Sequence, residues 1–309
     1  MLFLYFKKMK RCFKIKLLIL LLFIFLYDSA AYAISEIRPS ILAGTWYPAD
    51  KNELLEMINK FLASAHIPVI KGKIKAIIVP HAGYVYSGSV AAYAFKAIKG
   101  KMYKRVVMIG PCHRSFFYGV SVNLQKGYKT PLGIVPVDIE FAKKLIQESD
   151  QIRYVPMAHA CEHCLEIQLP FLQVVLKKGF KLVPILMGEQ DIYTCKKLAD
   201  AILRLLKNDK EPTLILASSD LSHYHSYKEA VHMDRILIQH VKQIDPDGLN
   251  TDTINGICEA CGKGAIMTAL FIAQRLGVKK ALLLKYANSG DVTGDHSRVL
   301  GYMSAVLST

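Results

Sequence analysis

The chain has 309 residues, 52% hydrophobic and 21% charged, and its 40 basic and 25 acidic side chains give a formal net charge of +15. This apolar content excludes a disordered or fibrous chain, and seven cysteines are too few for a small domain held together by disulfides. The positive charge could indicate a nucleic-acid or membrane partner, depending on where it lies.

The first 33 residues have the pattern of a secretory signal peptide. Six basic residues precede a short apolar run over residues 17–27, and small residues then lead to Ala31-Tyr32-Ala33. The run is shorter than the roughly 20 residues needed to span a bilayer. We therefore expect cleavage after Ala33 and an exported protein, periplasmic or extracellular, which contacts the membrane only transiently through this segment. The alternative is an uncleaved segment that anchors the protein in the membrane.

Removal of this segment weakens the argument from charge. It holds six basic residues and one acidic residue, so residues 34–309 keep a net charge of +10. The remaining lysines are dispersed, and we find no Walker motif, paired zinc-finger spacing or Arg-rich helix. We therefore predict no nucleic-acid partner. Without a linker or an internal repeat, residues 34–309 are expected to form one domain.

Strands and helices alternate along this domain. Helices are expected over residues 51–65, 89–98, 138–147, 162–178, 192–206, 227–241 and 262–276. Strands are expected over residues 74–79, 105–109, 120–124, 134–137, 181–186, 213–217, 281–286 and 299–307. The alternation predicts an α/β fold, a single three-layer domain with a central, largely parallel sheet. The strands are continuously apolar, as is typical of strands covered on both faces.

Three of the expected strands are each followed by a histidine. These are His81, His113 and His223. Open α/β sheets bind ligands beyond the carboxyl ends of their strands, so we expect the three side chains at one edge of the sheet. Neutral imidazole is the commonest metal ligand and the natural base near neutral pH.

A thiol or a carboxylate would complete a three-ligand metal site with open positions. The candidates are Asp220, Glu162, Glu166 and Cys261. Cys261 precedes an expected helix start and lies near Lys263, and both features would lower the thiol pKa. Thiolate with imidazole suits Fe, Cu or Zn better than Mg. The alternative for Cys261 is a small buried apolar residue.

Four cysteines form two C-x-x-C pairs, Cys161 with Cys164 and Cys258 with Cys261. Together the pairs could form a four-cysteine zinc site, although Cys164 is expected within a helix. In an exported protein, either pair could instead form a disulfide. The sequence leaves these alternatives open.

Two polar segments could border the pocket. His163 and Glu166 are three residues apart, so on a helix they share a face and could orient the ligand histidines. The alternative is an ordinary polar helix start. Ser289 and Asp291 lie in a Gly-rich segment that either borders the pocket or forms a hairpin turn. The chain has no G-x-S-x-G elbow and no G-x-G-x-x-G after a strand, which disfavours a serine hydrolase and a dinucleotide cofactor.

An ordered set of motifs resembles the MEMO family, also named AmmeMemoRadiSam system protein B. The set runs from about residue 37 to the C-terminus and comprises Arg38-Pro39, Ala43-Gly44-Thr45-Trp46-Tyr47-Pro48, Pro80-His81-Ala82-Gly83-Tyr84, Ser87-Gly88, Gly110-Pro111-Cys112-His113, Thr130-Pro131-Leu132-Gly133, Glu162-His163, Glu166, Leu169-Pro170, Ser218-Ser219-Asp220-Leu221-Ser222-His223, Cys261-Gly262 and Ser289-Gly290-Asp291. Each motif is weak alone, but the ordered set is highly specific.

The resemblance implies a fold like that of class III extradiol dioxygenases, which hold non-haem Fe(II) with two histidines and a carboxylate. By this resemblance, His81 and His113 match the histidine ligands and Cys261 falls at the carboxylate position. His223 matches the acid/base histidine, with Asp220 beside it. A thiolate in place of the carboxylate argues against dioxygenase activity.

Other properties of the family also become expectations. Members are linked to copper or iron binding, to redox chemistry and to phosphotyrosine-peptide binding, so a small-molecule or peptide ligand would contact Trp46, Tyr84, Ser289 and Asp291. The resemblance implies a functional link to radical-SAM and AMMECR-type proteins. The signal peptide is a departure from the usual member and would separate this chain from a cytoplasmic radical-SAM partner.

The leading hypothesis is a metalloprotein with one ion in a pocket of His81, His113 and Cys261. Fe(II) or Cu is the expected metal, with Zn as an alternative, and a redox role is expected. His223 and Asp220 would act as acid and base. The second hypothesis is a non-enzymatic module that binds a peptide or small ligand in the same pocket, and the third is a zinc-dependent hydrolase.

Overall fold

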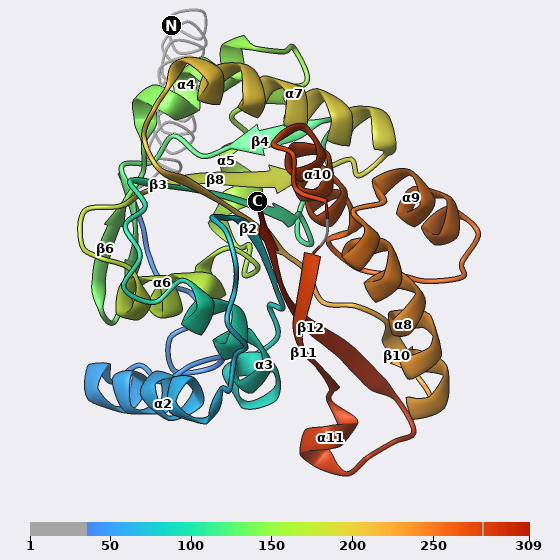
Figure 1. Ribbon diagram of the computed structural model, residues 1–309. Helices are drawn as coiled ribbons and strands as arrows, with labels where there is room; N and C mark the ends of the chain where they lie inside the picture. The colour runs from blue at the N-terminus through green and yellow to red at the C-terminus, as the bar shows by residue number, and fades with distance from the viewer. Residues whose placement is uncertain (1–35, 280) are drawn as a thin grey trace, which may run out of the picture. The chain divides into compact units, whose positions relative to one another are not determined.

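The computed structural model describes residues 36–279 and 281–309, which lie in the unit Glu36–Thr309. A central sheet with helices on both faces organises this part of the chain (Figure 1). The predicted signal segment, with its cleavage site and Cys12, lies outside the described residues. Within them, no helix is both long and apolar enough to cross a membrane.

Nine strands form the main sheet of the described residues. Its parallel centre consists, in spatial order, of β2 (Ile74–Val79), β9 (Thr213–Ser218), β3 (Arg105–Pro111) and β8 (Lys181–Met187). On one side, β12 (Val299–Ser308) pairs antiparallel with β2, and both β11 (Ala281–Asn288) and β10 (His223–His225) pair antiparallel with β12. On the other side, β4 (Val120–Val122) pairs antiparallel with β8, and β7 (Ile152–Arg153) pairs in parallel with β4. A separate small sheet contains β1 (Ile37–Arg38), β5 (Gly127–Thr130) and β6 (Gly133–Pro136).

Two groups of helices cover the two faces of the main sheet. One group comprises α2 (Lys51–Ser64), α3 (Tyr84–Ala97) and α6 (Leu169–Val175), and the other comprises α4 (Ile139–Gln147), α7 (Ile192–Asn208), α8 (Tyr227–Gln243) and α10 (Lys263–Arg275). The other helical segments of the described chain are α5 (Pro156–Ala160), η1 (Glu166–Gln168), α9 (Pro246–Ile254) and α11 (Gly290–Thr293).

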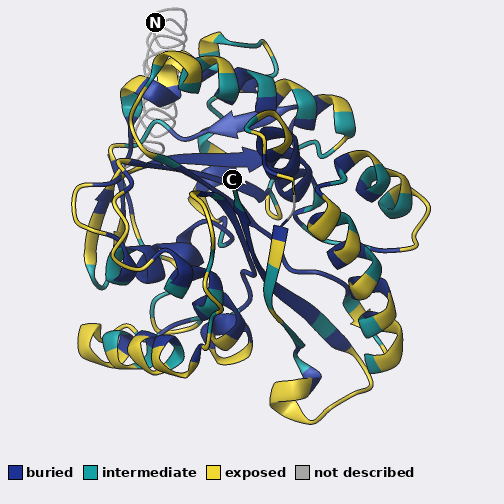
Figure 2. Ribbon diagram, in the orientation of Figure 1, coloured by how far each residue is buried: buried dark blue, intermediate teal, exposed yellow. Residues whose placement is uncertain are grey.

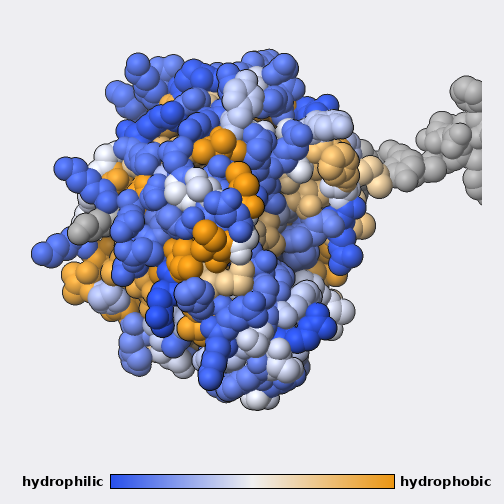
Figure 3. Space-filling view, turned by 90° about the vertical axis from the view of Figure 1, so that its right-hand side faces the viewer, coloured by the Kyte–Doolittle hydropathy of each residue, from blue (hydrophilic) through white to orange (hydrophobic). Residues whose placement is uncertain are grey.

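The core lies in two layers because successive side chains of a strand point to opposite faces of the sheet. In β2, Ala76 and Ile78 belong to one buried cluster, whereas Ile77 and Val79 belong to the other. Figure 2 accordingly shows the central strands as buried along their length. On the face shown in Figure 3, hydrophilic side chains surround small apolar patches. The predicted three-layer α/β fold with a mostly parallel sheet is confirmed.

The prediction of one helix over residues 162–178 is wrong. The chain forms η1 and then α6, which ends at Val175. The Glu162 carboxylate accepts hydrogen bonds from the backbone N–H groups of the next two residues, and this holds them in a turn. Pro170 then lies in the first turn of α6, where the missing N–H costs nothing.

Other elements differ from expectation in extent. Helix α3 begins at Tyr84, five residues before its expected start, and its N-cap is Gly83. Strand β5 was not predicted because only two of its four residues, Tyr128 and Thr130, favour strands. By contrast, α2 begins after Asp50 as expected, and the Asp50 carboxylate caps its first backbone N–H groups.

Candidate metal centre

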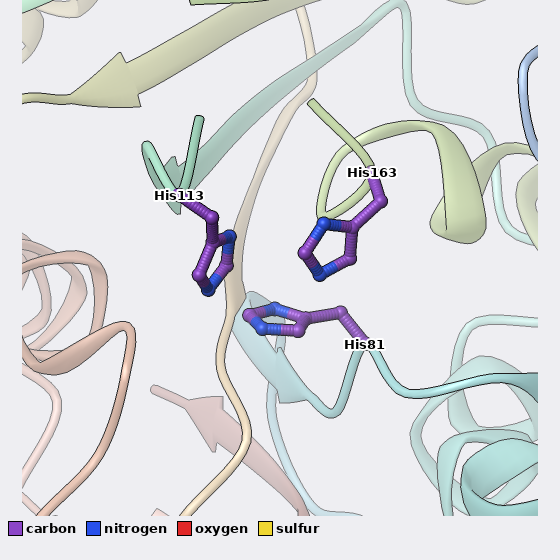
Figure 4. A group of neighbouring side chains, drawn as sticks. All are labelled: His81, His113 and His163. Carbon is purple, nitrogen blue, oxygen red and sulfur yellow. The ribbon is translucent and has the colours of Figure 1, made fainter. Parts of the chain in front are cut away.

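Three histidines converge beyond the carboxyl edge of the parallel strands. His81 lies two residues after β2, His113 lies two residues after β3, and His163 lies in the turn before η1. Their rings point toward one another (Figure 4). One ring nitrogen from each lies within 4.8 Å of the other two, and the ring centroids are 4.5–5.3 Å apart.

A single carboxylate orients two of these rings. Glu162 Oε1 accepts a hydrogen bond from His113 Nδ1 at 2.9 Å and lies 3.1 Å from His163 Nδ1. Oε2 accepts the backbone N–H of His113 at 2.6 Å. Both Nδ1 atoms lie on the side of this carboxylate, although His163 Nδ1 makes no hydrogen bond to the described residues, so the Nε2 atoms of both rings are left for the centre of the cluster. Such outer partners fix the orientation of metal-binding imidazoles.

The third ring is held from the opposite side. His81 Nδ1 lies 3.0 Å from Ser218 Oγ at the end of β9. Its Nε2 therefore faces the cluster, as the Nε2 atoms of the other rings do. The three histidines come from separate segments, yet each presents the same ring nitrogen.

The electrostatics favour neutral imidazoles at His81 and His163 beside one charged carboxylate. Burial, with the neighbouring histidines, lowers the pKa of both His81 and His163 to about 3. Burial acts to raise the pKa of Glu162, but hydrogen bonds from His113 and charge interactions with His113 and His163 lower it to about 2. Neutral imidazole is the form that binds metals.

Cys261 contacts this cluster but is not a poised thiolate. Its Sγ lies 3.0 Å from His81 Nε2 and accepts the Asp220 backbone N–H at 3.3 Å. Burial, with the nearby Asp220 carboxylate, raises the pKa of the thiol. The prediction that a helix start and Lys263 lower this pKa is therefore wrong, because desolvation of the thiolate outweighs both effects.

The other cysteines form neither predicted arrangement. All six cysteines of the described residues are free thiols. Cys164 is buried and donates to the Pro111 carbonyl, whereas Cys161 is exposed. No four-cysteine cluster occurs in the described part of the chain.

Asp220 and His223 lie beside the histidines. Asp220 Oδ1 accepts the backbone N–H groups of His81 at 2.7 Å and Ala82 at 3.3 Å, so this carboxylate fixes the turn after β2. Burial raises the pKa of Asp220. The His223 side chain lines the adjoining cleft, and its backbone N–H donates to Glu259 at 2.5 Å.

A cleft of about 760 Å³ opens beside the cluster. All three histidines contribute to its lining, together with Trp46, whose ring lies 4.6 Å from that of His163. The rest of the wall is rich in aromatic side chains and also includes Arg298 and Ser289. The cleft joins the candidate metal centre to solvent and is large enough for a small molecule.

Two residues predicted to contact a ligand do not line this cleft. Tyr84 is buried and donates its hydroxyl to the Ile167 carbonyl at 2.9 Å, because the early start of α3 turns it inward. Tyr86 lines the cleft instead. Asp291 accepts the Tyr227 hydroxyl at 2.8 Å, away from the histidines.

Glu166 was predicted as a residue that could orient the ligand histidines, but it does not contact their rings. Its buried carboxylate pairs with Arg38 and accepts hydrogen bonds from Ser40 Oγ at 2.7 Å and Tyr47 Oη at 2.8 Å. It therefore holds the N-terminal segment of the described chain against η1. The orienting role belongs to Glu162, which sequence reasoning had considered only as a direct ligand. The adjacent pair Glu162-His163 was the available signal.

Comparisons with known proteins place the chain in one family. A family model described as "Memo-like protein" matches residues 38–306. A "MEMO1 family protein" of Nitrosopumilus maritimus is 38% identical over 271 residues, which cover 86% of this chain and 98% of the relative. Another of Ignicoccus hospitalis is 37% identical over 275 residues, with 86% and 96% covered. A third of Thermoplasma volcanium is 36% identical over 272 residues, with 87% and 98% covered.

Proposed function

Since this chain belongs to the Memo-like protein family, we propose that it is a metalloprotein with one transition-metal ion held by the Nε2 atoms of His81, His113 and His163. The observation that carries the proposal is the convergence of three imidazoles, of which His81 and His113 are held through Nδ1 by Ser218 and Glu162. Ordinary core packing gives no reason for three histidine rings to face one another, whereas a metal ion bound by imidazoles does.

The donor set indicates the class of metal. Imidazole suits Fe, Cu, Zn and Ni, while Mg and Ca prefer oxygen donors. We propose Fe(II) or Cu, either of which would supply redox chemistry, with the open positions directed at the cleft. The polar and aromatic side chains of the cleft would hold the ligand next to the ion.

Cys261 distinguishes two versions of the site. The Cys261 thiol lies against His81 Nε2. If the ion takes the three imidazoles only, the Cys261 thiol keeps its proton. If Cys261 also binds the ion, its half-buried thiol must lose a proton. Calorimetric titration in two buffers of different ionisation enthalpy measures this proton count.

Elemental analysis tests the proposal directly. The reduced protein without an affinity tag is loaded with Fe(II) or Cu under anaerobic conditions and compared with His81→Ala and His163→Ala. His66→Ala is the matched control, since His66 is exposed and outside the cluster. We expect near-stoichiometric metal in the wild type and the control and a loss in both cluster variants. Equal metal in all four proteins would refute the proposal.

The cleft supports a second candidate, a module that binds a ligand without catalysis. Its walls carry Trp46, Tyr86, Tyr224 and Tyr302, which are side chains that often form recognition surfaces. The discriminating result is a wild-type protein that holds no more Fe, Cu or Zn than His81→Ala. Zinc alone, without oxygen consumption, would instead favour a zinc-dependent hydrolase.

We also propose that the protein is exported after cleavage behind Ala33. The basic and apolar pattern of residues 1–33 supports this proposal. N-terminal sequencing of the protein from its native host should find Ile34 first. An intact Met1 in the membrane fraction would refute cleavage and favour an anchor.

A further inference from the structure

The hydroxyl of Ser218 has three buried neighbours. It lies 2.7 Å from the Cys164 carbonyl oxygen, 2.9 Å from Gln168 Nε2 and 3.0 Å from His81 Nδ1. Ser218, Gln168 and His81 are all at most 2% exposed, so solvent cannot take the place of a missing partner.

Two of these contacts have a fixed direction. A carbonyl oxygen only accepts, so the single hydroxyl proton of Ser218 must point to Cys164. Gln168 must present its amide nitrogen, because the same group also lies 2.9 Å from the Pro80 carbonyl oxygen, which cannot donate. Gln168 therefore donates to Ser218.

Only one direction is then left for the hydrogen bond between His81 and Ser218. The Ser218 proton is used, and one of the two lone pairs of its oxygen receives the Gln168 amide. The contact with His81 can be a hydrogen bond only if Nδ1 carries a proton and donates it to the second lone pair. Neutral His81 then has no proton on Nε2.

We propose that Ser218 is a positioning residue that fixes His81 in the Nδ1–H tautomer and so keeps the Nε2 lone pair directed at the histidine cluster. The inference concerns the protonation pattern of the metal-free protein and deepens the proposed function, on which its consequence for metal binding rests. Ser218 contacts no ion itself and acts through His81.

The environment of Nε2 shows what Ser218 prevents. Cys261 Sγ lies 3.0 Å from His81 Nε2, and Asp220 Oδ2 lies 3.9 Å from it. Cys261 Sγ is close enough to accept a hydrogen bond from Nε2, whereas Asp220 Oδ2 lies beyond hydrogen-bond distance. Without the Ser218 acceptor, His81 would place its proton on Nε2, where it would block metal binding.

The first experiment needs no variant. In the metal-free, ¹⁵N-labelled wild type near pH 7.5, long-range ¹H–¹⁵N correlation spectra distinguish a protonated from an unprotonated ring nitrogen. The His81 signals are assigned by their loss in His81→Gln. We expect the proton on Nδ1. A proton on Nε2 overturns the proposal, whatever the metal content of the protein.

The second experiment uses Ser218→Ala, with Ser304→Ala as the matched control. Ser304 is also a buried strand serine that donates to a carbonyl, that of Val90, outside the histidine cluster. We expect Ser218→Ala to move the His81 proton to Nε2 and to weaken Co²⁺ binding, followed by visible absorbance, about 10–100-fold. Ser304→Ala should change neither, although both variants lose a buried hydrogen bond.

The outcomes separate this inference from the proposed function. An unchanged His81 tautomer in folded Ser218→Ala overturns the positioning role. A tautomer shift in a protein that binds no Co²⁺ even as wild type supports that role and refutes the metal site. If Ser218→Ala does not fold, the wild-type tautomer alone decides.

Discussion

Glu162→Gln is the most informative single change, because one carboxylate holds two of the three histidines. Oε1 accepts the backbone N–H groups of His163 at 2.9 Å and Cys164 at 3.0 Å as well as His113 Nδ1, while Oε2 accepts the backbone N–H of His113 at 2.6 Å. Glutamine keeps the shape, but in either orientation its NH₂ group faces N–H donors. The variant therefore opposes donor to donor in a buried site.

The lowered pKa of Glu162 gives the magnitude. The pKa falls from the ordinary value of 4.5 to about 2, against the opposing effect of burial. Since one pKa unit is equivalent to about 1.4 kcal/mol, the fold stabilises the ionised form by about 3 kcal/mol. A carboxyl group with a lowered pKa contributes this stability above pH 4.5 and loses it as the pH falls toward 2. Glu162→Gln should therefore unfold about 3 kcal/mol more easily at pH 7.

Urea unfolding at pH 7 and pH 3.5 measures this effect. The matched control is Glu148→Gln, whose ion pair with Arg204 is partly exposed and should contribute less than about 1 kcal/mol. We expect the difference between wild type and Glu162→Gln to shrink at pH 3.5. The reasoning is refuted if Glu162→Gln is as stable as the control at pH 7, or if its deficit is independent of pH. Metal affinity should also fall about 10–100-fold.

Three further predictions concern residues outside the cluster. Burial lowers the pKa of His159 to about 3, so the contribution of this side chain to the stability of the fold is full above pH 6.5 and declines as the pH falls toward 3. His159→Gln should therefore lose less melting temperature than the wild type between pH 7 and pH 5. The ring of Phe171 stacks on that of Phe95 with centroids 4.7 Å apart, so Phe171→Ala should lower the free energy of unfolding by about 3–5 kcal/mol, measured with urea. A loss below about 1 kcal/mol would contradict the role of Phe171 in the core. Asp50→Ala should remove the cap of α2 and cost about 1 kcal/mol, and an Asp50→Asn variant should recover most of it in the same assay.

Local sequence signals were sufficient where structure depends on neighbouring residues. Continuous apolar runs predicted the four parallel strands, and Asp50 predicted the start of α2, because periodicity and capping act within a few residues. The same logic placed His81 and His113 at one edge of the sheet, since each follows a parallel strand.

Signals of this kind failed where a distant group decides the local conformation. Residues 162–178 are amphipathic enough to predict a helix, but the Glu162 carboxylate is turned toward His113 and holds the chain in a turn. The position of Tyr84 shows the same limit, because the start of α3 one turn earlier than expected buries this side chain and exposes Tyr86 to the cleft.

Periodic patterns and ordered motifs are properties of the chain, so the family, the α/β architecture and the histidines at the carboxyl edge could be predicted before the structure. Folding was needed to bring His163 into the cluster and to make Cys261 a half-buried thiol with a raised pKa. Those features depend on desolvation and on hydrogen bonds between segments far apart in the chain, such as Ser218 with His81. The order of residues does not specify which donor meets which acceptor until the sheet has placed them side by side.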